Sequence, residues 1–550
     1  MGGTVSWGRE GCEAKMEGGG IHAIELVALL LLVFVVLFAA LARKLQTPYP
    51  IVLVIAGLVL SFLPGIPKVT LNPDVIFLVV LPPLLYNGAW LTSWREFKFN
   101  FVSILLLAFG LVGFTVAGVA WTARWVFAGF DWRLGFVLGA VVATTDAIAA
   151  TAIAKRVGLP QGIIDVLEGE SLLNDATGLL ALEFGVAMVV TGEAPTMGSG
   201  ILRLSYLIVA AIAVGLVLGV IMESIHKRID DGPIEITMSI LAPYAVYLAA
   251  EAIHSSGVLA VVACGLYMSR HRSHFFSPSV RIQAWAVWDS LTFALNGLVF
   301  MLIGLQLPFV LAGIHEYSFR ELVQYGALFS VLLILLRMIW MYPGAILANL
   351  IRRHLLHQKI PRPPARQIFV VGWTGMRGVL ALAAALALPE ALADGTAFPQ
   401  RNLIIFLTFC VILVTLVLQG LTLPPLIRAL GLVGAVGHRD EEENARRAMI
   451  EAALAHLEKA RAKDGDEFAG VYSEIEQKYK NRLTNLIGKD DHGLAADRQA
   501  YARYLELSRS LLTAERRTAL ELRRDGQIND EVLRKVEHEL DLTETRLSLM

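Results

Sequence analysis

Long apolar segments recur along the first 430 residues, and each is about as long as a helix that crosses a bilayer. A crossing helix needs roughly 20 apolar residues for a hydrocarbon core of about 30 Å. We read thirteen such segments, of which the second and ninth are short. They cover residues 22–42, 49–64, 73–91, 99–120, 133–154, 163–190, 200–225, 233–253, 256–269, 286–307, 322–350, 367–388 and 402–428. The pattern predicts an all-α polytopic membrane protein with about thirteen transmembrane helices.

The character of the chain changes at both ends of this region. From about residue 438 Leu, Ala, Glu and Arg recur at helical spacing, with charged i,i+4 pairs opposite an apolar stripe. We therefore expect a disordered N-terminal leader at 1–21, a transmembrane domain at 22–430 and a cytoplasmic helical region at 431–550. The helical region is either a solvated appendage or a packing surface; its stripe consists of Ile450, Leu454, Leu457 and Ala460.

Composition excludes an ordinary soluble enzyme. The chain is 56% hydrophobic and 17% charged, and its mean hydropathy is +0.61. Three scattered cysteines are too few for a disulfide framework or a metal cluster. The helical region from about residue 438 shows no Walker, dinucleotide, zinc or nucleic-acid signature. We expect no cofactor and no nucleic-acid partner.

Loop charges predict the orientation in the membrane. The odd-numbered connections between the predicted helices carry sixteen Lys and Arg residues, and the even-numbered ones carry six. Positive loops stay in the cytoplasm. The N-terminus is therefore expected outside and the C-terminal region inside. The six even-numbered residues are Lys68, Arg124, Arg133, Arg203, Arg320 and Arg401.

Two predicted helices are interrupted near their middle by small and polar residues. They are the fifth and the twelfth, seven positions apart, so two six-helix halves, 1 to 6 and 8 to 13, would place them at equivalent positions in inverted repeats. Paired interruptions of this kind point to a transporter binding site at mid-membrane. Glycines alone also suit close helix packing, but packing does not account for an arginine. The interruptions are Thr144, Thr145 and Asp146 in one helix, and Gly372, Thr374, Gly375, Arg377 and Gly378 in the other.

Four polar residues share one face of the segment at 163–190. At about 100° per residue they fall within one arc of the helix. Carboxylate, amide and hydroxyl oxygens suit a hard cation such as sodium, and carboxylates in hydrocarbon are costly unless they serve a purpose. Interhelical hydrogen bonding is the alternative reading of this face. The four are Glu170, Ser171, Asn174 and Asp175.

Arg377 must be neutralised at this depth, because an unpaired charge in the membrane interior is costly. We expect Glu170 to be its partner, which leaves Asp175 free to hold either a proton or a cation. Competition of the two ions for Asp175 would then couple their movements.

Other polar residues in the apolar segments give weaker indications. We expect Glu25, Glu251 and Arg337 to lie near helix ends or to snorkel. Asp289 and Asn296 either line a cavity or serve packing and capping.

Four motifs stand out in the third, fifth, sixth and twelfth segments: LPPLLYNGAW, TTDAIAAT, GESLLND and WTGMRG. Together they resemble the cation/proton antiporter-1 family, the bacterial sodium/proton exchangers related to animal ones. The resemblance covers residues 22–430. It implies two inverted six-helix repeats with two discontinuous crossing helices, a homodimer, a core domain that slides against a dimerisation domain, and electroneutral exchange.

The same resemblance assigns roles to individual residues. It implies that Asp175 carries the cation and the proton, with Ser171 and the Thr145 carbonyl as further candidate ligands of Na⁺. Asp146 and Asn174 would stabilise the crossing of the broken helices.

The resemblance also bears on a buried ion pair and on one position where this chain differs from some family members. The resemblance implies that Glu170 pairs with Arg377. Where some members carry an acidic residue after the aromatic of the LPPLL run, this chain has Asn87. A further cation ligand is therefore absent or replaced by an amide.

We thus expect a secondary antiporter of the bacterial inner membrane, not an enzyme, which exchanges Na⁺ and Li⁺ for protons and serves pH homeostasis. Its expected partners are a second copy of the chain, the lipid bilayer, monovalent cations and protons. Exchange of K⁺ for protons is the alternative within the class. An intramembrane enzyme would need a convergent nucleophile, base and metal, and a passive channel favours a continuous pore over one exchangeable carboxylate. The ion order, the pH set point, the direction of transport and the partner of the tail stay open.

Overall fold

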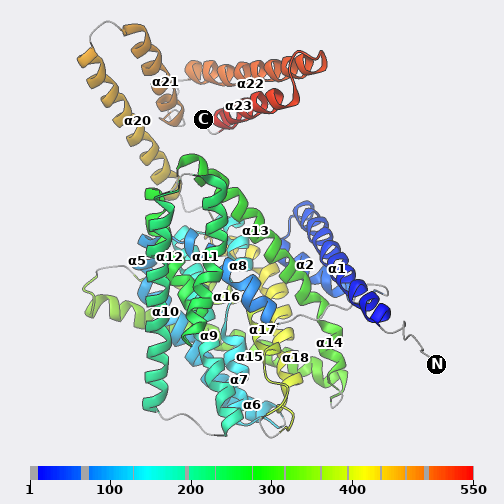
Figure 1. Ribbon diagram of the computed structural model, residues 1–550. Coiled ribbons are helices and arrows are strands. Elements are labelled where there is room, and N and C mark those ends of the chain that lie inside the picture. The colour runs from blue at the N-terminus through cyan, green and yellow to red at the C-terminus, as the bar shows by residue number, and fades with distance from the viewer. Residues whose placement is uncertain are drawn as a thin grey trace, which may run out of the picture. The chain divides into compact units, whose positions relative to one another are not determined.

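The computed structural model describes residues 10–63, 73–127, 129–192, 197–229, 231–275, 277–314, 317–358, 362–392, 395–433, 437–464, 468–487 and 495–548. Regular structure in these residues is helical, apart from one isolated bridge between Ala391 and Ala397. The chain divides into a membrane unit, Met1–Gly434, and a tail unit, Ala435–Met550 (Figure 1). The all-α prediction is confirmed.

Every predicted apolar segment coincides with a helix or a helical stretch of the membrane unit. Among the described residues, nine stretches are long and apolar enough to cross a bilayer. The count of thirteen and the inverted repeats stay predictions. The elements are α1 (Glu10–Lys44), α2 (Tyr49–Leu60), α3 (Pro73–Val75), η1 (Ile76–Val80), α4 (Leu81–Leu91), α5 (Trp94–Leu105), η2 (Leu106–Leu111), α6 (Val112–Val126), α7 (Trp132–Ala143), α8 (Ala147–Val157), α9 (Gln161–Thr191), α10 (Met197–His226), α11 (Gly232–Ala252), α12 (Gly257–Phe275), α13 (Pro278–Leu305), α14 (Leu307–Ala312), α15 (Phe319–His354), α16 (Ala365–Trp373), α17 (Val379–Leu386), α18 (Arg401–Val414), η3 (Thr415–Gln419) and α19 (Gly420–Ala429). The η elements are π-helical turns within longer helices.

Helix α1 begins earlier than expected. It starts at Glu10, so residues 10–21 are helical and the expectation of a disordered leader is wrong for them. Propagating an existing helix by a residue costs little compared with starting one, which lets the apolar helix extend into a glycine-containing stretch. Residues 1–9 of the expected leader lie outside the described residues.

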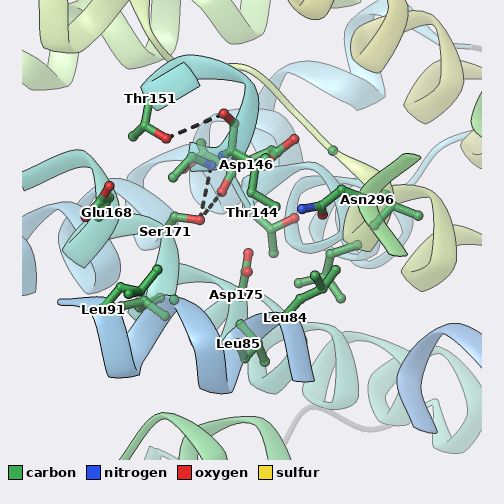
Figure 2. A pocket seen from close by; sticks show the side chains of 18 of the residues that line it. Leu84, Leu85, Leu91, Thr144, Asp146, Thr151, Glu168, Ser171, Asp175 and Asn296 are labelled. Carbon is green, nitrogen blue, oxygen red and sulfur yellow. Dashed lines mark hydrogen bonds between the residues drawn. The ribbon is translucent and has the colours of Figure 1, made fainter. Parts of the chain in front are cut away.

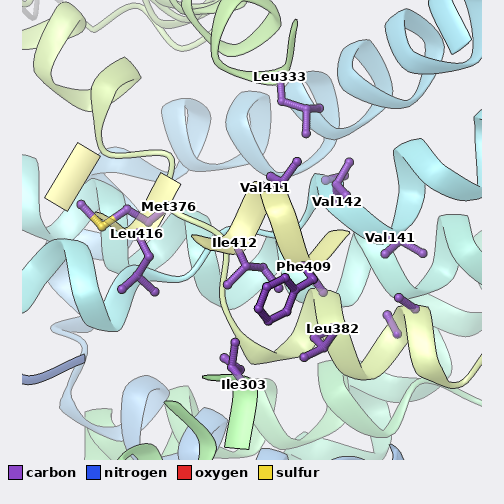
Figure 3. Close-up of a cluster of buried hydrophobic side chains, with 14 of the residues drawn as sticks. Val141, Val142, Ile303, Leu333, Met376, Leu382, Phe409, Val411, Ile412 and Leu416 are labelled. Atoms are coloured by element: carbon purple, nitrogen blue, oxygen red, sulfur yellow. The ribbon is translucent and has the colours of Figure 1, made fainter. Parts of the chain in front are cut away.

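The main apolar core surrounds the second interrupted helix. Phe409 and Ile412 of α18 pack with Leu382 of α17 and Val141 of α7, and all four are fully buried (Figure 3). Met376, in the interruption itself, belongs to the same cluster and is 0% exposed. The broken backbone is therefore enclosed by protein, where its polar groups must find partners.

A second apolar cluster joins α4, α11, α12 and α13. At its centre the rings of Tyr86, Trp90 and Trp288 lie 5.7 to 6.1 Å apart. Elsewhere α13 packs closely on α2 through Gly57 and Gly304: a Cβ at either glycine would lie 2.3 Å from a backbone oxygen of the other helix. Small residues of this kind let membrane helices approach closely.

The described residues of the tail unit form four helices, α20 (Gly437–Asp464), α21 (Ala469–Ile487), α22 (Ala495–Arg524) and α23 (Asp530–Ser548). Helix α20 pairs with α21, and α22 pairs with α23. The predicted stripe on α20 is its covered side, with Ile450 5% exposed. Arg516 of α22 contacts Asp541 and Glu544 of α23 at 2.7 and 2.9 Å. The tail thus packs on itself through helix pairs.

Candidate functional site

The first interrupted helix breaks between Ala143 and Ala147, where the backbone is extended. Asp146 starts the second half, since its Oδ1 accepts a hydrogen bond from the Ile148 N–H at 2.8 Å. Aspartate is a preferred residue at a helix start for this reason. The other oxygen, Oδ2, is buried and receives no hydrogen bond from the described residues. The break therefore fixes Asp146 and leaves one carboxylate oxygen unused.

The second interrupted helix touches the first at this point. Helix α16 ends at Trp373 and α17 begins at Val379. The Asp146 N–H donates to the Met376 carbonyl at 2.8 Å. A Cβ on Gly378 would lie only 2.6 Å from the Cβ of Asp146. The two predicted breaks are confirmed, and they lie in contact.

Helix α9 holds the first break in place. The Ser171 hydroxyl donates to the Thr145 carbonyl at 2.8 Å and accepts from the Ala147 N–H at 3.3 Å. The Asn174 amide donates to the Thr145 hydroxyl at 2.5 Å. Asn174 thus braces the break through Thr145, and no hydrogen bond joins it to Asp146 among the described residues. The Thr145 carbonyl keeps a second lone pair that a cation could use.

The buried carboxylate of Glu170 pairs with Arg337, so the predicted pairing with Arg377 is wrong. Arg337 donates to both Glu170 oxygens, at 2.5 and 2.9 Å, and the two side chains are 1% and 0% exposed. This forked geometry is that of the strongest guanidinium–carboxylate pairs. Arg337 also donates to the carbonyls of Val371 and Gly372, each at 3.1 Å. It therefore closes the end of α16 as well.

The expectation that Arg337 lies near a helix end or snorkels is also wrong. Helix α15 runs Phe319–His354, and Arg337 lies seventeen residues before its end. At 1.5 Å per residue this is about 26 Å, well beyond the reach of a side chain. Its central place in an apolar segment was a signal in the sequence, because an arginine there needs a buried partner just as Arg377 does.

Arg377 binds backbone instead of a carboxylate. Its Nε donates to the Val142 carbonyl at 3.0 Å, and a second guanidinium nitrogen donates to the Gly375 carbonyl. The backbone N–H of Arg377 donates to the Thr415 hydroxyl at 3.1 Å. Val142 is in the last turn of α7, where unpaired carbonyls carry partial negative charge. The first half of each interrupted helix therefore ends against a buried arginine.

A cavity of about 450 Å³ beside the crossing brings together most of the predicted site. Asp175 is half-buried, and among the described residues it has no hydrogen-bond or ion-pair partner. Figure 2 shows Asp175 facing the space between Ser171, Thr144 and Asn296 on one side and Leu84 and Leu85 of α4 on the other. The polar residues that line the cavity next to the crossing are Thr144, Thr145, Asp146, Ser171, Asp175 and Asn296.

Only some of the other polar residues singled out from the sequence line this cavity. Asn87 is not among its lining residues, although its neighbour Gly88 is. Of the two residues left open on α13, Asn296 lines the cavity and Asp289 is exposed outside it. Asn174 is 1% exposed and lies behind Thr145 instead of in the cavity.

Charged residues that the sequence reading missed also line the cavity. Lys155 contacts Glu168 at 2.8 Å, and Gln161 donates to Asp165 at 3.0 Å. These residues belong to the end of α8 and the first turns of α9. Glu168 lies seven residues before Asp175, which is close to two helical turns. That spacing could have extended the predicted polar face toward the start of the helix.

The sequence matches a family model described as the transmembrane part of sodium/hydrogen exchangers, over residues 29–429. The chain belongs to the sodium/hydrogen exchanger family. It is accordingly a multi-pass membrane protein of a family of ion transporters.

Several named relatives and structures are similar to this chain. One named as an uncharacterized Na⁺/H⁺ exchanger of Mycobacterium tuberculosis is 32% identical over 95% of this chain and 96% of its own. The sodium, potassium, lithium and rubidium/H⁺ antiporter of Bacillus pumilus is 33% identical over 80% of this chain and 66% of its own. The structure of the sodium proton antiporter MjNhaP1 of Methanocaldococcus jannaschii matches with a TM-score of 0.59, at 21% identity, over 74% of this chain and 98% of that one. The similarity to the MjNhaP1 structure shows the fold of this chain.

Proposed function

We propose that this chain exchanges Na⁺ for protons, with Asp175 as the site that both ions share. The observation that carries the proposal is a half-buried carboxylate that has no hydrogen-bond or ion-pair partner among the described residues, in a cavity beside two broken helices. Glu170 is unsuited to this role because Arg337 occupies both of its oxygens. Family membership and the names of the relatives support the same activity.

The oxygens around Asp175 suggest how a cation is held. Thr145, Ser171 and Asp146 line the same cavity. They offer a carbonyl, a hydroxyl and the buried carboxylate oxygen Oδ2, which receives no hydrogen bond from the described residues. These are hard oxygen donors, which suit alkali cations. A proton on Asp175 removes the charge that attracts the cation, so the site holds one ion or the other. Asp175 carries one Na⁺ in one direction and one proton in the other. No net charge therefore crosses the membrane, and the exchange is electroneutral.

Potassium/proton exchange is the second candidate function. The Bacillus pumilus relative and one from Bacillus subtilis, 31% identical, are both named for sodium, potassium, lithium and rubidium. We propose Na⁺ and Li⁺ as the preferred cations of this chain. A panel of Li⁺, Na⁺, K⁺ and Rb⁺ on reconstituted protein at several pH values decides between the two candidates.

We further propose a homodimer in a bacterial inner membrane, with the N-terminus outside and the C-terminus in the cytoplasm. The excess of Lys and Arg in the odd-numbered connections supports this orientation. Bacterial relatives support the membrane assigned.

Replacing Asp175 by asparagine tests the proposal. Asn has no charge to attract a cation and no proton to exchange, so Asp175→Asn should abolish Na⁺-driven proton movement in everted vesicles or proteoliposomes. Asp289→Asn is the matched control, because Asp289 is exposed outside the cavity, and it should exchange at the wild-type rate. Exchange retained by well-folded Asp175→Asn would remove Asp175 as the carrier.

A further inference from the structure

A second cavity, of about 390 Å³, has no described lining residue in common with the cavity beside the crossing. It lies among α5, η2, α9, α15 and α16, and most of its wall is apolar. Among the residues that the structure describes, its polar lining consists of two arginines, two amides and one serine, without a carboxylate. The apolar wall includes Leu107, Ile163, Val166, Met341, Ile368 and Val371.

Arg352 gives this cavity a buried positive charge that has no acidic partner in the described part of the chain. Its side chain is 9% exposed. One guanidinium nitrogen donates to the Ser103 hydroxyl at 3.1 Å and to the Phe99 carbonyl at 3.4 Å, but Nε is buried and finds no acceptor among the described residues. Neither Arg352 nor the exposed Arg362, which also lines the cavity, forms an ion pair with a described residue. A buried cation with a free donor is costly unless an anion binds it.

Two helix starts add to the positive potential of the cavity. Helices α9 and α16 begin after Pro160 and Pro364, and no described side chain caps either helix. Residues of both first turns, among them Gly162 and Gln367, line the cavity. The free N–H groups at helix starts favour anions, phosphate in particular. Arg352 and the first turns of α9 and α16 therefore line the same cavity.

We propose that this cavity binds an anionic phospholipid, with its phosphate at Arg352 and the two helix starts. The acyl chain would lie along the apolar wall, which a soluble anion would leave unfilled. Apolar side chains next to the lining residues, Phe101 on α5 and Ile346 and Leu347 on α15, are 41 to 44% exposed. Both helices thus face outward with surfaces that suit a bilayer, and basic pockets between transmembrane helices are known places for lipid phosphates.

The test uses the full-length chain, purified in detergent and delipidated, with native mass spectrometry and the thermal unfolding midpoint as readouts. Phosphatidylglycerol should bind and raise the midpoint, whereas phosphatidylcholine and inorganic phosphate should not. Arg352→Gln should weaken phosphatidylglycerol binding about tenfold or more, the effect of losing a charge-assisted hydrogen bond. Arg353→Gln is the matched control, because Arg353 is the exposed neighbour, and it should bind like wild type.

A second variant blocks the cavity without removing charge. A Cβ on Gly162 would meet nothing within 4 Å, so Gly162→Leu should fold and fill the space. It should lose phosphatidylglycerol, whereas Gly113→Leu, at another open glycine outside the cavity, should keep it. If Arg352→Gln fails to fold, the comparison of Gly162→Leu with Gly113→Leu still tests whether the lipid binds in this cavity. Unchanged lipid binding by folded Arg352→Gln and Gly162→Leu, or an equal midpoint shift with inorganic phosphate or phosphatidylcholine, overturns the proposal.

Discussion

Gly378 lacks a side chain because Asp146 occupies the adjacent space. A Cβ there would lie 2.6 Å from the Asp146 Cβ and 2.9 Å from its Oδ2. The backbone at Gly378 is extended, with φ −126°, so the constraint is steric and not conformational. The closeness of the two broken helices therefore depends on this one missing methyl group.

Gly378→Ala should consequently slow exchange by displacing Asp146. Overpacking of this kind costs about 1–3 kcal/mol, and the thermal midpoint should fall with the initial rate of Na⁺-driven proton movement. Gly113→Ala serves as the control, because a Cβ at Gly113 meets nothing within 4 Å. A Gly378→Ala protein with the wild-type rate would show that Asp146 tolerates displacement.

The ion pair of Glu170 and Arg337 makes a different prediction, about stability. Arg337→Met leaves a buried carboxylate alone and should cost about 3–5 kcal/mol of unfolding free energy, whereas replacing both partners by methionine should restore most of it. A double-mutant cycle on thermal or denaturant unfolding measures the coupling. Strict additivity of the two single changes would contradict a direct pair.

The same residues show how far sequence reasoning reaches. Asp146, Ser171 and Asp175 could be placed in one site, because helical spacing and the interruption are local features of the chain. The partner of Glu170 could not be chosen, since both Arg337 and Arg377 are buried arginines and only the packing of α15 decides which one reaches the carboxylate. The local sequence pattern thus predicts which polar groups form the site, whereas tertiary packing determines which arginine pairs with Glu170.

Close approach of α2 and α13 is set by glycines that face backbone. A Cβ on Gly304 would lie 2.3 Å from the Val54 carbonyl oxygen, and one on Gly57 would lie 2.3 Å from that of Met301. Backbone cannot move aside as the end of a flexible side chain can, so any larger residue must separate the helices. The interface therefore admits only glycine at these two positions.

Gly304→Ala should destabilise the membrane unit by at least the ~1–3 kcal/mol typical of overpacking. Adding Gly57→Ala should cost less than its single effect, because the helices are already apart. Thermal unfolding in detergent measures both, with Gly198→Ala as the control at an open position. Fully additive losses would mean that the two glycines act independently.

At the level of elements, the positions of the helices follow from the apolar pattern, and so do the two interruptions. The start of α1 does not, because glycine-containing residues join a helix that the following apolar stretch stabilises. The cavity residues Lys155 and Glu168 belong to segment ends, where periodicity fades and only spacing relative to Asp175 would have pointed to them.

The whole chain combines a membrane unit and a tail unit that each bury their own apolar residues. Both large apolar clusters lie within residues 31–432, and the family match covers 29–429. In the tail unit the few buried residues, among them Leu512, Leu533 and Leu540, lie on its own helix pairs. The core that holds the crossing in place is therefore complete without the tail unit.

A chain truncated after residue 434 should accordingly fold and exchange ions. The matched MjNhaP1 structure spans 74% of this chain and 98% of its own, which shows that this fold exists at about the length of the membrane unit. We expect a monodisperse protein in detergent and cation-driven proton movement in proteoliposomes, with the truncated Asp175→Asn variant as the inactive control. A change in the pH dependence of the truncated chain, at an unchanged maximal rate, would assign a regulatory role to the tail. Loss of folding would instead mean that the membrane unit depends on the tail for stability, against the separation of the two apolar cores.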